Sequence, residues 1–293
     1  MAATVSIGVC AYNEGRNIRR TLESILVQQT AMPMGEVLVV SSGSTDDTDA
    51  IVKEIATRDG RVRLLRQETR EGKNSAVNLF MAEAKGEVLV LVNADNILKE
   101  GCLEALLAHF KDDEVGVVGA HPLPVNSTDT VAGFAVNMLW DMHHKLAMIH
   151  PKVGEVIAFR NQHMQIPVGM QSDEDLIRMQ LEAKGLRTEY EGAAHVINKG
   201  PSNVKDYIKQ RTRVNIGERY MKRWFDYDIP TWDKRYLFQA YISFLKENVR
   251  HPFLILAAMS LEAYARGYAT VHVMMDKGDR PVWSMVDSTK KVE

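Results

Sequence analysis

The segment EVLVLVNADN, residues 87–96, decides how the rest of this chain can fold. Its first six residues are almost wholly apolar and rich in valine, a pattern typical of a strand buried on both faces of a parallel sheet. The run stops abruptly at NADN, where a turn with a helix cap would also explain the residues. Ligands of open α/β sheets bind outside the carboxyl ends of strands, and there Asn93 and Asp95 can flank a divalent metal.

Strand and helix patterns alternate on both sides of this segment. Asn13 is a candidate N-cap for the first helix, because it directly follows the first strand. Such alternation predicts a parallel sheet joined by right-handed helical crossovers. The predicted strands cover residues 4–11, 36–40, 62–66, 87–92 and 115–119, and the helices between them cover residues 14–29, 44–58, 72–84 and 99–110.

Size and composition indicate an ordinary globular chain. It has 293 residues, 45% of them hydrophobic and 25% charged, with a net charge of −2. This charge argues against a nucleic-acid partner, which requires a strongly basic surface. Cys10 and Cys102 lie in apolar patterns and predict a reducing compartment. No signal peptide and no uncharged window of about 20 residues is evident, so we expect a cytoplasmic protein without a membrane span.

The second half is less regular and more helical. We divide the chain into a catalytic domain at residues 1–220 and a C-terminal helical extension at residues 221–293. Aromatic and basic residues gather in the extension, which predicts either peripheral contact with the inner face of a membrane or a homo-oligomer interface. We expect helices at 130–149, 172–184, 202–223, 236–248 and 253–268, a strand at 154–160, and one or two strands at 187–198.

Polar motifs recur where predicted strands end or helices begin. These are the positions at which a nucleotide is held in this architecture. In chain order they are AYNEGRNI at 11–18, VVSSGSTDDT at 39–48, GK at 72–73, NAD at 93–95, DED at 173–175 and QRTRV at 210–214.

Together, in this order, the motifs resemble those of the family 2 glycosyltransferases, over roughly residues 4–215. The resemblance implies the GT-A fold, a Rossmann-like α/β fold with a mostly parallel central sheet flanked by helices. It also implies transfer of a sugar from a nucleotide-diphosphate donor, with inversion at the anomeric carbon. NAD stands where the family has its metal-binding DxD motif, so Mg²⁺ or Mn²⁺ is the implied cofactor.

The resemblance also assigns site residues. DED matches the acidic pair of the family, whose second member is the catalytic base, here Asp175. QRTRV resembles the motif that grips the donor diphosphate. A third metal ligand of some GT-A enzymes would correspond to His195. The segment 154–160, which precedes the acidic pair, would line the donor-sugar and acceptor side. Donor-binding candidates are Ala11, Tyr12, Glu14, Ser42, Lys73, Asn93, Ala94, Gln210, Arg211 and Arg213, acceptor-side candidates are Phe159, Arg160 and Glu174, and the metal candidates are Asp95 and His195.

The chain departs from the family pattern at three places. Ser41 and Ser42 stand in place of two aspartates, and a hydroxyl cannot supply the charge of a carboxylate. Asn93 replaces the first aspartate of DxD, which lowers the negative charge at the metal. Val214 replaces a tryptophan and removes a stacking surface. The nucleotide base therefore stays open at this point.

Each candidate also has a structural alternative. Asp175 falls in the first turn of a helix, where the macrodipole favours acids in any protein. Gln210 and Arg213 share one helical face that would also suit solvent. Lys73 would serve equally as a surface lysine, and a lone histidine in an apolar strand, such as His195, is commonly a core residue.

The motifs predict an inverting, metal-assisted glycosyltransferase. Its acceptor would carry a hydroxyl group, on a lipid, a glycan or a small molecule. One alternative is a nucleotidyltransferase, which shares the sheet and the metal edge but needs a glycine-rich basic loop that Glu14-Gly15-Arg16 matches poorly. The other alternative is an inactive module that binds nucleotide sugars. The replacements at Ser41, Ser42 and Asn93 favour this alternative.

Overall fold

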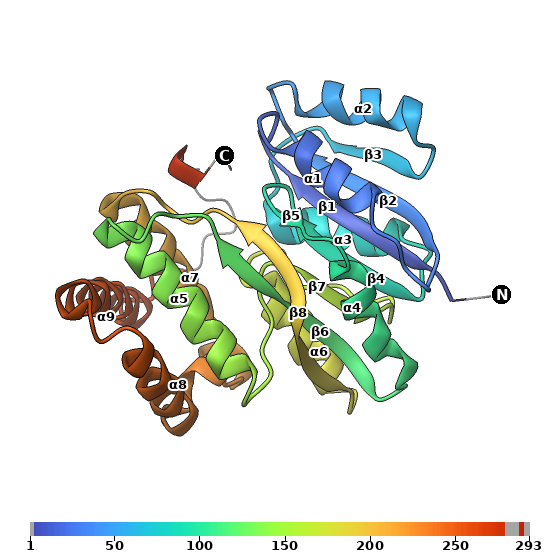
Figure 1. Ribbon diagram of the computed structural model, residues 1–293. Helices are drawn as coiled ribbons and strands as arrows, with labels where there is room; N and C mark the ends of the chain where they lie inside the picture. Colours follow the sequence, from blue (N-terminus) through green and yellow to red (C-terminus); the bar gives the residue numbers. More distant parts are fainter. Residues whose placement is uncertain (1–2, 279–286, 290–293) are drawn as a thin grey trace. The chain divides into compact units, whose positions relative to one another are not determined.

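The computed structural model describes residues 3–278 and 287–289 of the chain (Figure 1). Its described residues form two compact units. The first unit comprises residues 3–122 and 153–197, and the second comprises residues 123–152, 198–278 and 287–289. We describe each unit by itself.

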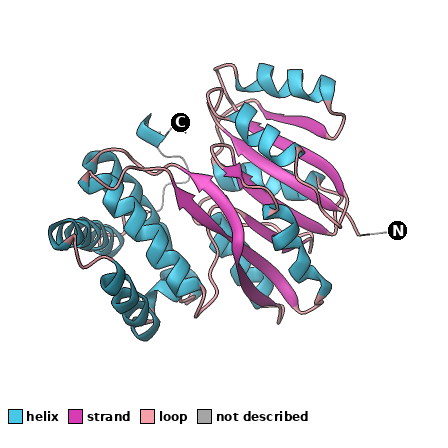
Figure 2. Ribbon diagram, viewed as in Figure 1, coloured by secondary structure: helices cyan, strands magenta, loops and turns pink. Residues whose placement is uncertain are grey.

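The first unit is built on the mixed sheet drawn in magenta in Figure 2. Eight strands lie in the order β3-β2-β1-β4-β7-β6-β8-β5. The strands are β1 (Val5–Ala11), β2 (Met34–Ser42), β3 (Val62–Gln67), β4 (Val88–Asn93), β5 (Ile97–Leu98), β6 (Val115–Pro124), β7 (Ile157–Arg160) and β8 (Arg187–Asn198).

The predicted parallel core is confirmed by β3, β2, β1 and β4. Each neighbouring pair in this group is parallel. The alternating side chains Val5, Ile7 and Val9 of β1 are all 0% exposed. Burying one such side chain contributes about 1.5–3 kcal/mol to folding. This apolar content explains why β1 is the central strand of the parallel core.

The other half of the sheet departs from the parallel prediction. β7 pairs antiparallel with both β4 and β6, and β5 pairs antiparallel with β8. β6 runs in the direction of β4 but is separated from it, because β7 lies between them. An apolar run that is buried on both faces does not encode strand direction, so the sequence pattern alone was compatible with either arrangement.

The helices lie close to their predicted positions. The first helix is shorter than expected, since it begins at Ile18 instead of residue 14. The last helix is longer and extends to Met274. The α-helices are α1 (Ile18–Leu26), α2 (Thr48–Arg58), α3 (Lys73–Glu83), α4 (Cys102–Ala108), α5 (Val131–Ala147), α6 (Asp173–Glu182), α7 (Val204–Phe225), α8 (Lys234–Glu247) and α9 (Pro252–Met274), and the 3₁₀ helices are η1 (His109–Lys111), η2 (Pro230–Trp232) and η3 (Asp287–Thr289).

The second unit is helical. α9 packs against α7 and α5, and α8 also packs against α5. Its core contains Phe134, Tyr207, Phe244 and Ile255. α5 and α7 thus group with the C-terminal helices, whereas the sequence placed a boundary at residue 220. Among the described residues, no helix is both long and apolar enough to cross a bilayer.

One close contact fixes α3 against the sheet. A Cβ added to Gly8, in β1, would lie 2.5 Å from ring atoms of Phe80, in α3. That distance is shorter than any allowed carbon–carbon contact, so β1 needs glycine where the Phe80 ring covers it. Phe80 itself is 0% exposed.

We expect Gly8→Ala to lower the free energy of unfolding by about 1–3 kcal/mol, because the new methyl group overpacks the core against Phe80. Urea denaturation measures the change. Gly60→Ala is the matched control, since a Cβ at Gly60 meets no atom within 4 Å. Equal stability of the two variants would contradict the close packing of α3 on β1.

Candidate functional site

The carboxyl ends of the parallel strands bring the predicted motifs together. In the registers of β1 with its neighbours, Cys10 lies opposite Val40 of β2 and Asn93 of β4. The next residue, Ala11, lies opposite Ser41. The loops after β1, β2 and β4 therefore leave the sheet at one edge, which is where α/β folds bind ligands.

Asn13 links the first two of these loops. Its N–H donates to Ser44 Oγ at 3.1 Å, and its side-chain Oδ1 accepts the N–H of Thr45 at 2.8 Å. Its backbone is left-handed, with φ of 52°. The prediction that Asn13 caps the first helix is wrong, because α1 begins after Asn17 and the Asn13 side chain reaches across to the second loop.

Two further hydrogen bonds join the same loops. The N–H of Glu14 donates to Thr48 Oγ1 at 2.8 Å, and the N–H of Gly15 donates to Asp46 Oδ2 at 2.9 Å. The Glu14 carboxylate also accepts Asn17 Nδ2 at 3.0 Å. Glu14 thus has a structural role in the loop, and its contact with a nucleotide stays a prediction. The bonds hold the two loops ready before any ligand binds.

The third loop completes this side of the edge. The guanidinium of Arg70 stacks over the Tyr12 ring, 4.0 Å from its centroid. The Ser42 hydroxyl accepts the N–H of Glu71 at 3.2 Å. The interpretation of Ser42 as a donor contact is not tested by this bond, since a hydroxyl can also donate. Arg70 was missed in the sequence, because its only signal is a basic residue before the glycine that precedes α3.

The NADN loop is anchored from two sides. Thr21 Oγ1, in α1, donates to the carbonyl of Ala94 at 2.8 Å. Asn93 Nδ2 donates to Glu155 Oε2 at 2.8 Å, and Asn96 Nδ2 donates to the same oxygen at 3.2 Å. Glu155 lies within the segment 154–160 that we expected to line the donor-sugar and acceptor side, but neither Glu155 nor Asn96 was singled out. Both become part of the site because β7 begins beside the end of β4.

Glu155 lies in an electrostatic field of like charge. Burial, and then the charge of Asp95, raise the pKa of the Glu155 carboxyl, while the Asn93 amide opposes the shift. The charge of Glu174 acts in the same direction as that of Asp95. Glu174 in α6 and Asp95 after β4 are therefore both near Glu155, so the acidic turn belongs to the same edge as the NADN loop.

Lys73 is tied to the acidic turn at the start of α6. Its ammonium lies 2.8 Å from Asp173 Oδ2 and 3.1 Å from Glu174 Oε1. Burial alone would lower the pKa of Lys73, but the two carboxylates outweigh it and raise the pKa. Lys73 thus positions the acidic turn, and its contact with a donor stays a prediction. Asp175 is in the same turn and only partly buried.

The oxygen atoms at this edge fit a hard divalent cation. Mg²⁺ is usually held by one or two carboxylates, with waters and substrate phosphates as its other ligands. Asp95 and Glu155 supply two carboxylates, and Asn96 Oδ1 is a buried acceptor that has no hydrogen-bond donor. No cluster of three or more His, Cys, Asp or Glu side chains able to hold a metal occurs in residues 3–278 and 287–289.

His195, in β8, packs against His121, in β6. Its ring centroid lies 5.3 Å from that of His121, and the two rings meet edge to face. His121 Nδ1 lies 3.0 Å from the carbonyl oxygen of Gly192. This packing agrees with the structural alternative for His195 and does not support it as a third metal ligand.

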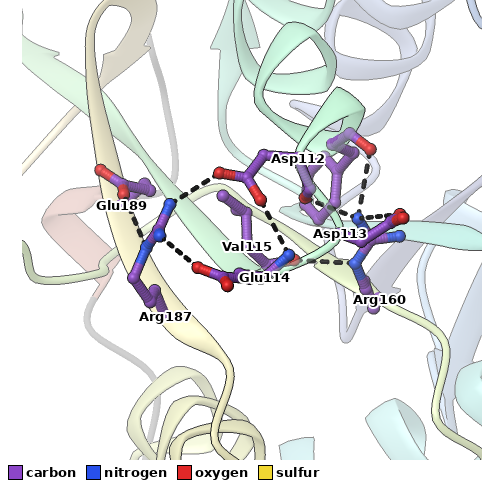
Figure 3. Close-up of polar contacts among 8 residues, drawn as sticks. Asp112, Asp113, Glu114, Val115, Arg160, Arg187 and Glu189 are labelled. Atoms are coloured by element: carbon purple, nitrogen blue, oxygen red, sulfur yellow. Dashed lines mark hydrogen bonds and ion pairs between the residues drawn. The ribbon is translucent and has the colours of Figure 1, made fainter.

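The acceptor-side predictions for Phe159 and Arg160 are contradicted. Phe159 is 0% exposed, and Arg160 lies opposite Val88, at the amino end of β4. Figure 3 shows the Arg160 guanidinium against the turn before β6, where it donates to the carbonyls of Val115 and Asp112, each at 2.8 Å. The physical reason is the antiparallel direction of β7, which carries its last residues away from the site.

Arg211 forms an ion pair within the second unit. Its guanidinium forms a bidentate pair with Glu262 of α9, with both nitrogen–oxygen distances at 2.9 Å. Although burial favours the protonated acid, Arg211 and Arg266 hold the pKa of Glu262 well below its usual range. This pair gives Arg211 a structural role, and its donor contact stays a prediction. Gln210 and Arg213 are partly buried in α7, and their roles also stay predictions.

Comparison with known proteins agrees with the geometry of this edge. The model of the family described as Glycosyl transferase family 2 matches residues 6–167, more than half of the chain. A second model, described as Glycosyl transferase family group 2, matches residues 88–275. The chain therefore belongs to glycosyl transferase family 2.

Individual relatives are more distant. Glycosyltransferase GlyG of Streptococcus pneumoniae is 35% identical over 118 residues, which are 40% of this chain and 38% of that protein. The match thus spans well under half the length of this curated relative. Among solved structures, a mannosyltransferase of Pyrobaculum calidifontis has a TM-score of 0.60 at 20% identity, covering 94% of this chain and 80% of its own. TarS of S. aureus has a TM-score of 0.51 at 17% identity, covering 94% and 91%. The structural likenesses show the GT-A fold.

We expect Arg211→Met to lower the free energy of unfolding at pH 7 by about 3 kcal/mol, because it leaves the partly buried Glu262 with Arg266 alone. The depressed pKa of Glu262 contributes stability above its unfolded value, and this contribution is lost as pH falls through the acidic range. The loss caused by Arg211→Met should therefore shrink between pH 7 and pH 3. Urea denaturation at both pH values measures it.

The control for this variant is Lys205→Met, an exposed change on the same helix, which should stay within about 0.5 kcal/mol of wild type. A loss that is no larger for Arg211→Met than for Lys205→Met would show that the pair contributes nothing to stability.

Proposed function

We propose that this chain is an inverting glycosyltransferase that moves a sugar from a nucleotide-diphosphate donor to an acceptor hydroxyl. The observation that carries the proposal is the convergence of three features at one edge of the sheet. These are the bonded loops after β1 and β2, the Asp95 loop after β4, and the acidic first turn of α6. A nucleotide, its diphosphate and an acceptor each need one of these features.

The donor would lie along the loops in order. Its base would contact Ala11 and Tyr12, where the Arg70 guanidinium already covers one ring face. Gln210 and Arg213 of the second unit stay the candidates for the diphosphate, because a planar guanidinium binds phosphate oxygens with two parallel hydrogen bonds. Ser41 and Ser42 offer hydroxyl groups and no charge, so hydrogen bonds to the ribose or base are their available contribution.

Asp175 would act as the base. It takes the proton of the acceptor hydroxyl as that oxygen attacks the anomeric carbon from the face opposite the diphosphate. The new carbon–oxygen bond forms while the bond to the diphosphate breaks, and the bonding electrons leave with the diphosphate. Attack from the opposite face inverts the anomeric centre.

A divalent cation would assist the departure of the diphosphate. When bound, it offsets the negative charge that grows on the leaving group. Asp95 would hold it at the end of β4. The mannosyltransferase of similar fold from P. calidifontis is described in complex with GDP-mannose and Mn²⁺, which supports the same kind of cofactor here.

The acceptor would be lipid-linked, and the second unit carries the reason. The only charged residues in α9 are Glu262 and Arg266, which pair with each other, and Glu262 also pairs with Arg211. Many of its exposed side chains are apolar, with Phe253 at 86% and Met274 at 78% exposure. An apolar surface of this size on a soluble protein marks an interaction site.

Nearby charge supports a lipid surface as the partner of this face. The exposed residues Lys246 and Arg250 each follow in sequence a residue that lines the apolar groove between α8 and α9. Basic residues beside exposed aromatic and aliphatic side chains bind anionic lipid headgroups, each contributing about 1 kcal/mol near the surface. The groove is lined by Tyr241, Leu245, Val249, Pro252, Ile255, Leu256 and Met259.

We expect the protein to float with vesicles that contain phosphatidylglycerol and much less with pure phosphatidylcholine vesicles. Phe253→Ser with Leu256→Ser should abolish flotation, because both side chains are exposed and their loss leaves the core intact. A matched control is Val27→Ser in the first unit, which is 73% exposed and outside the apolar face. Absence of flotation, or a dimer that the double variant dissociates in light scattering, would contradict the lipid proposal.

We expect GDP or UDP, together with Mn²⁺, to raise the melting temperature, since a ligand at about 100 times its dissociation constant adds about 2.7 kcal/mol to stability. Asp175→Asn should keep this rise, because the base does not bind the nucleotide. With a donor and an acceptor identified, the turnover of the variant should fall by about a hundredfold or more, the usual scale for loss of a general base.

The exposed change Glu23→Gln, in α1, is the control for charge alone and should leave turnover unaltered. A fully active Asp175→Asn would assign the base to another residue. A protein that no nucleoside diphosphate stabilises would contradict the glycosyltransferase proposal itself.

A further inference from the structure

A carboxylate lies beside Asn93 although the family pattern places one at residue 93 itself. Asn93 Nδ2 donates to Glu155 Oε2 at 2.8 Å and to the Glu155 carbonyl oxygen at 3.3 Å. The side chain at 93 is thus an amide that points at an acid, and the acid comes from a residue 62 positions later in the chain. The carboxylate that residue 93 lacks is thus present on Glu155, which lies next to Asn93 in space.

The backbone at Glu155 is costly for the residue it carries. Its φ is 62°, in the left-handed region that glycine occupies without strain and other residues rarely adopt. A non-glycine residue held there costs on the order of 1 kcal/mol or more, and such positions cluster at functional sites. Gly154 stands next to it in the sequence, so the strained position carries an acid while the adjacent residue is the glycine.

Asn96 provides a second and independent sign of a ligand. It is 0% exposed, and its Nδ2 donates to Glu155 Oε2 at 3.2 Å. Its other polar atom, Oδ1, is buried without any hydrogen-bond donor. A buried acceptor left without a donor costs about 1–3 kcal/mol, and a bound cation would remove that cost. Asn96 directly follows Asp95, the carboxylate expected to bind metal.

We propose that Glu155 replaces the missing acid at residue 93, and that Glu155, Asp95 and Asn96 Oδ1 form one oxygen-lined site for a divalent cation. The proposal rests on the proposed function, because it names further ligands for the cation of the same reaction. Hard cations prefer carboxylate and amide oxygens, and a small one needs only two or three protein ligands when phosphate and water supply the others. The antiparallel start of β7 is what delivers Glu155 to this place.

The experiment exchanges the acid and the amide. Glu155→Gln keeps the size of the side chain and removes its charge, so Mn²⁺ affinity should fall about tenfold or more. The double variant Glu155→Gln with Asn93→Asp places a carboxylate at residue 93 and an amide at residue 155. It thereby exchanges the two partners of the 2.8 Å hydrogen bond between Asn93 Nδ2 and Glu155 Oε2. The double variant should bind Mn²⁺ within about threefold of wild type. Free Mn²⁺ is measured by electron paramagnetic resonance, with the ion alone, with GDP and with UDP.

Two controls separate charge and folding from ligation. Glu87→Gln removes one exposed charge at the opposite end of β4 and should leave the affinity for Mn²⁺ unchanged. Thermal melting shows whether each variant is folded. If Glu155→Gln is unfolded, Glu155→Asp serves instead, since it keeps the charge and withdraws it by one methylene; it should also weaken Mn²⁺ binding.

The outcomes separate this proposal from the proposed function. If Glu155→Gln binds Mn²⁺ as wild type does while Asp95→Asn does not, Glu155 is not a ligand and the metal at Asp95 stands. If the double variant binds as weakly as Glu155→Gln, the exchange between residues 93 and 155 is overturned. If wild type binds no Mn²⁺ in any condition, the cation site is overturned, while nucleotide stabilisation and the Asp175→Asn kinetics still decide glycosyl transfer.

Discussion

The pairing of β7 with β4 is the constraint on which the candidate site depends. Leu91 lies opposite Ile157, and Val88 lies opposite Arg160, so β7 runs against the direction of β4. The start of β7 is thereby held at the carboxyl end of β4, and Glu155 comes to lie beside Asn93. A parallel β7 would have brought Arg160 to this edge instead. The direction of β7 thus determines whether the site gains the carboxylate of Glu155 or the guanidinium of Arg160.

The edge also depends on a balance of charge. Four acidic residues, Asp95, Glu155, Asp173 and Glu174, act on one another there, and Lys73 neutralises part of their charge through two contacts. Buried carboxylates without compensating charge would raise each other's pKa and weaken the fold. Lys73 and the N-terminus of α6 keep the acidic turn folded, while an incoming cation would complete the balance. The proposed donor and cation would therefore bind to a surface that is already arranged.

The helices of the second unit are joined by a buried ion pair and by an aromatic core. In the second unit, the pair between Arg211 and Glu262 joins α7 to α9, and the core around Phe134 and Phe244 joins α5 to α8. These contacts use both charged residues of α9, and many of its other exposed side chains are apolar. Arg211, which the sequence pattern assigned to donor binding, thus stabilises helix packing, while its near neighbours Gln210 and Arg213 keep the binding proposal.

The sequence alone determined the parallel core, the family and the order of the motifs, because burial periodicity and strand-end motifs are local properties. It predicted Asp95 at a strand end and the acidic turn of α6, both of which the structure brings to one edge. Only the tertiary structure decided the direction of β7, the partner of Arg211 and the place of Glu155. These follow from hydrogen bonds between segments far apart in the chain, and a hydrophobic run reads the same in either direction. For that reason the whole segment 154–160 was predicted to line the site, whereas Glu155, just before β7, reaches it and Phe159 and Arg160 do not.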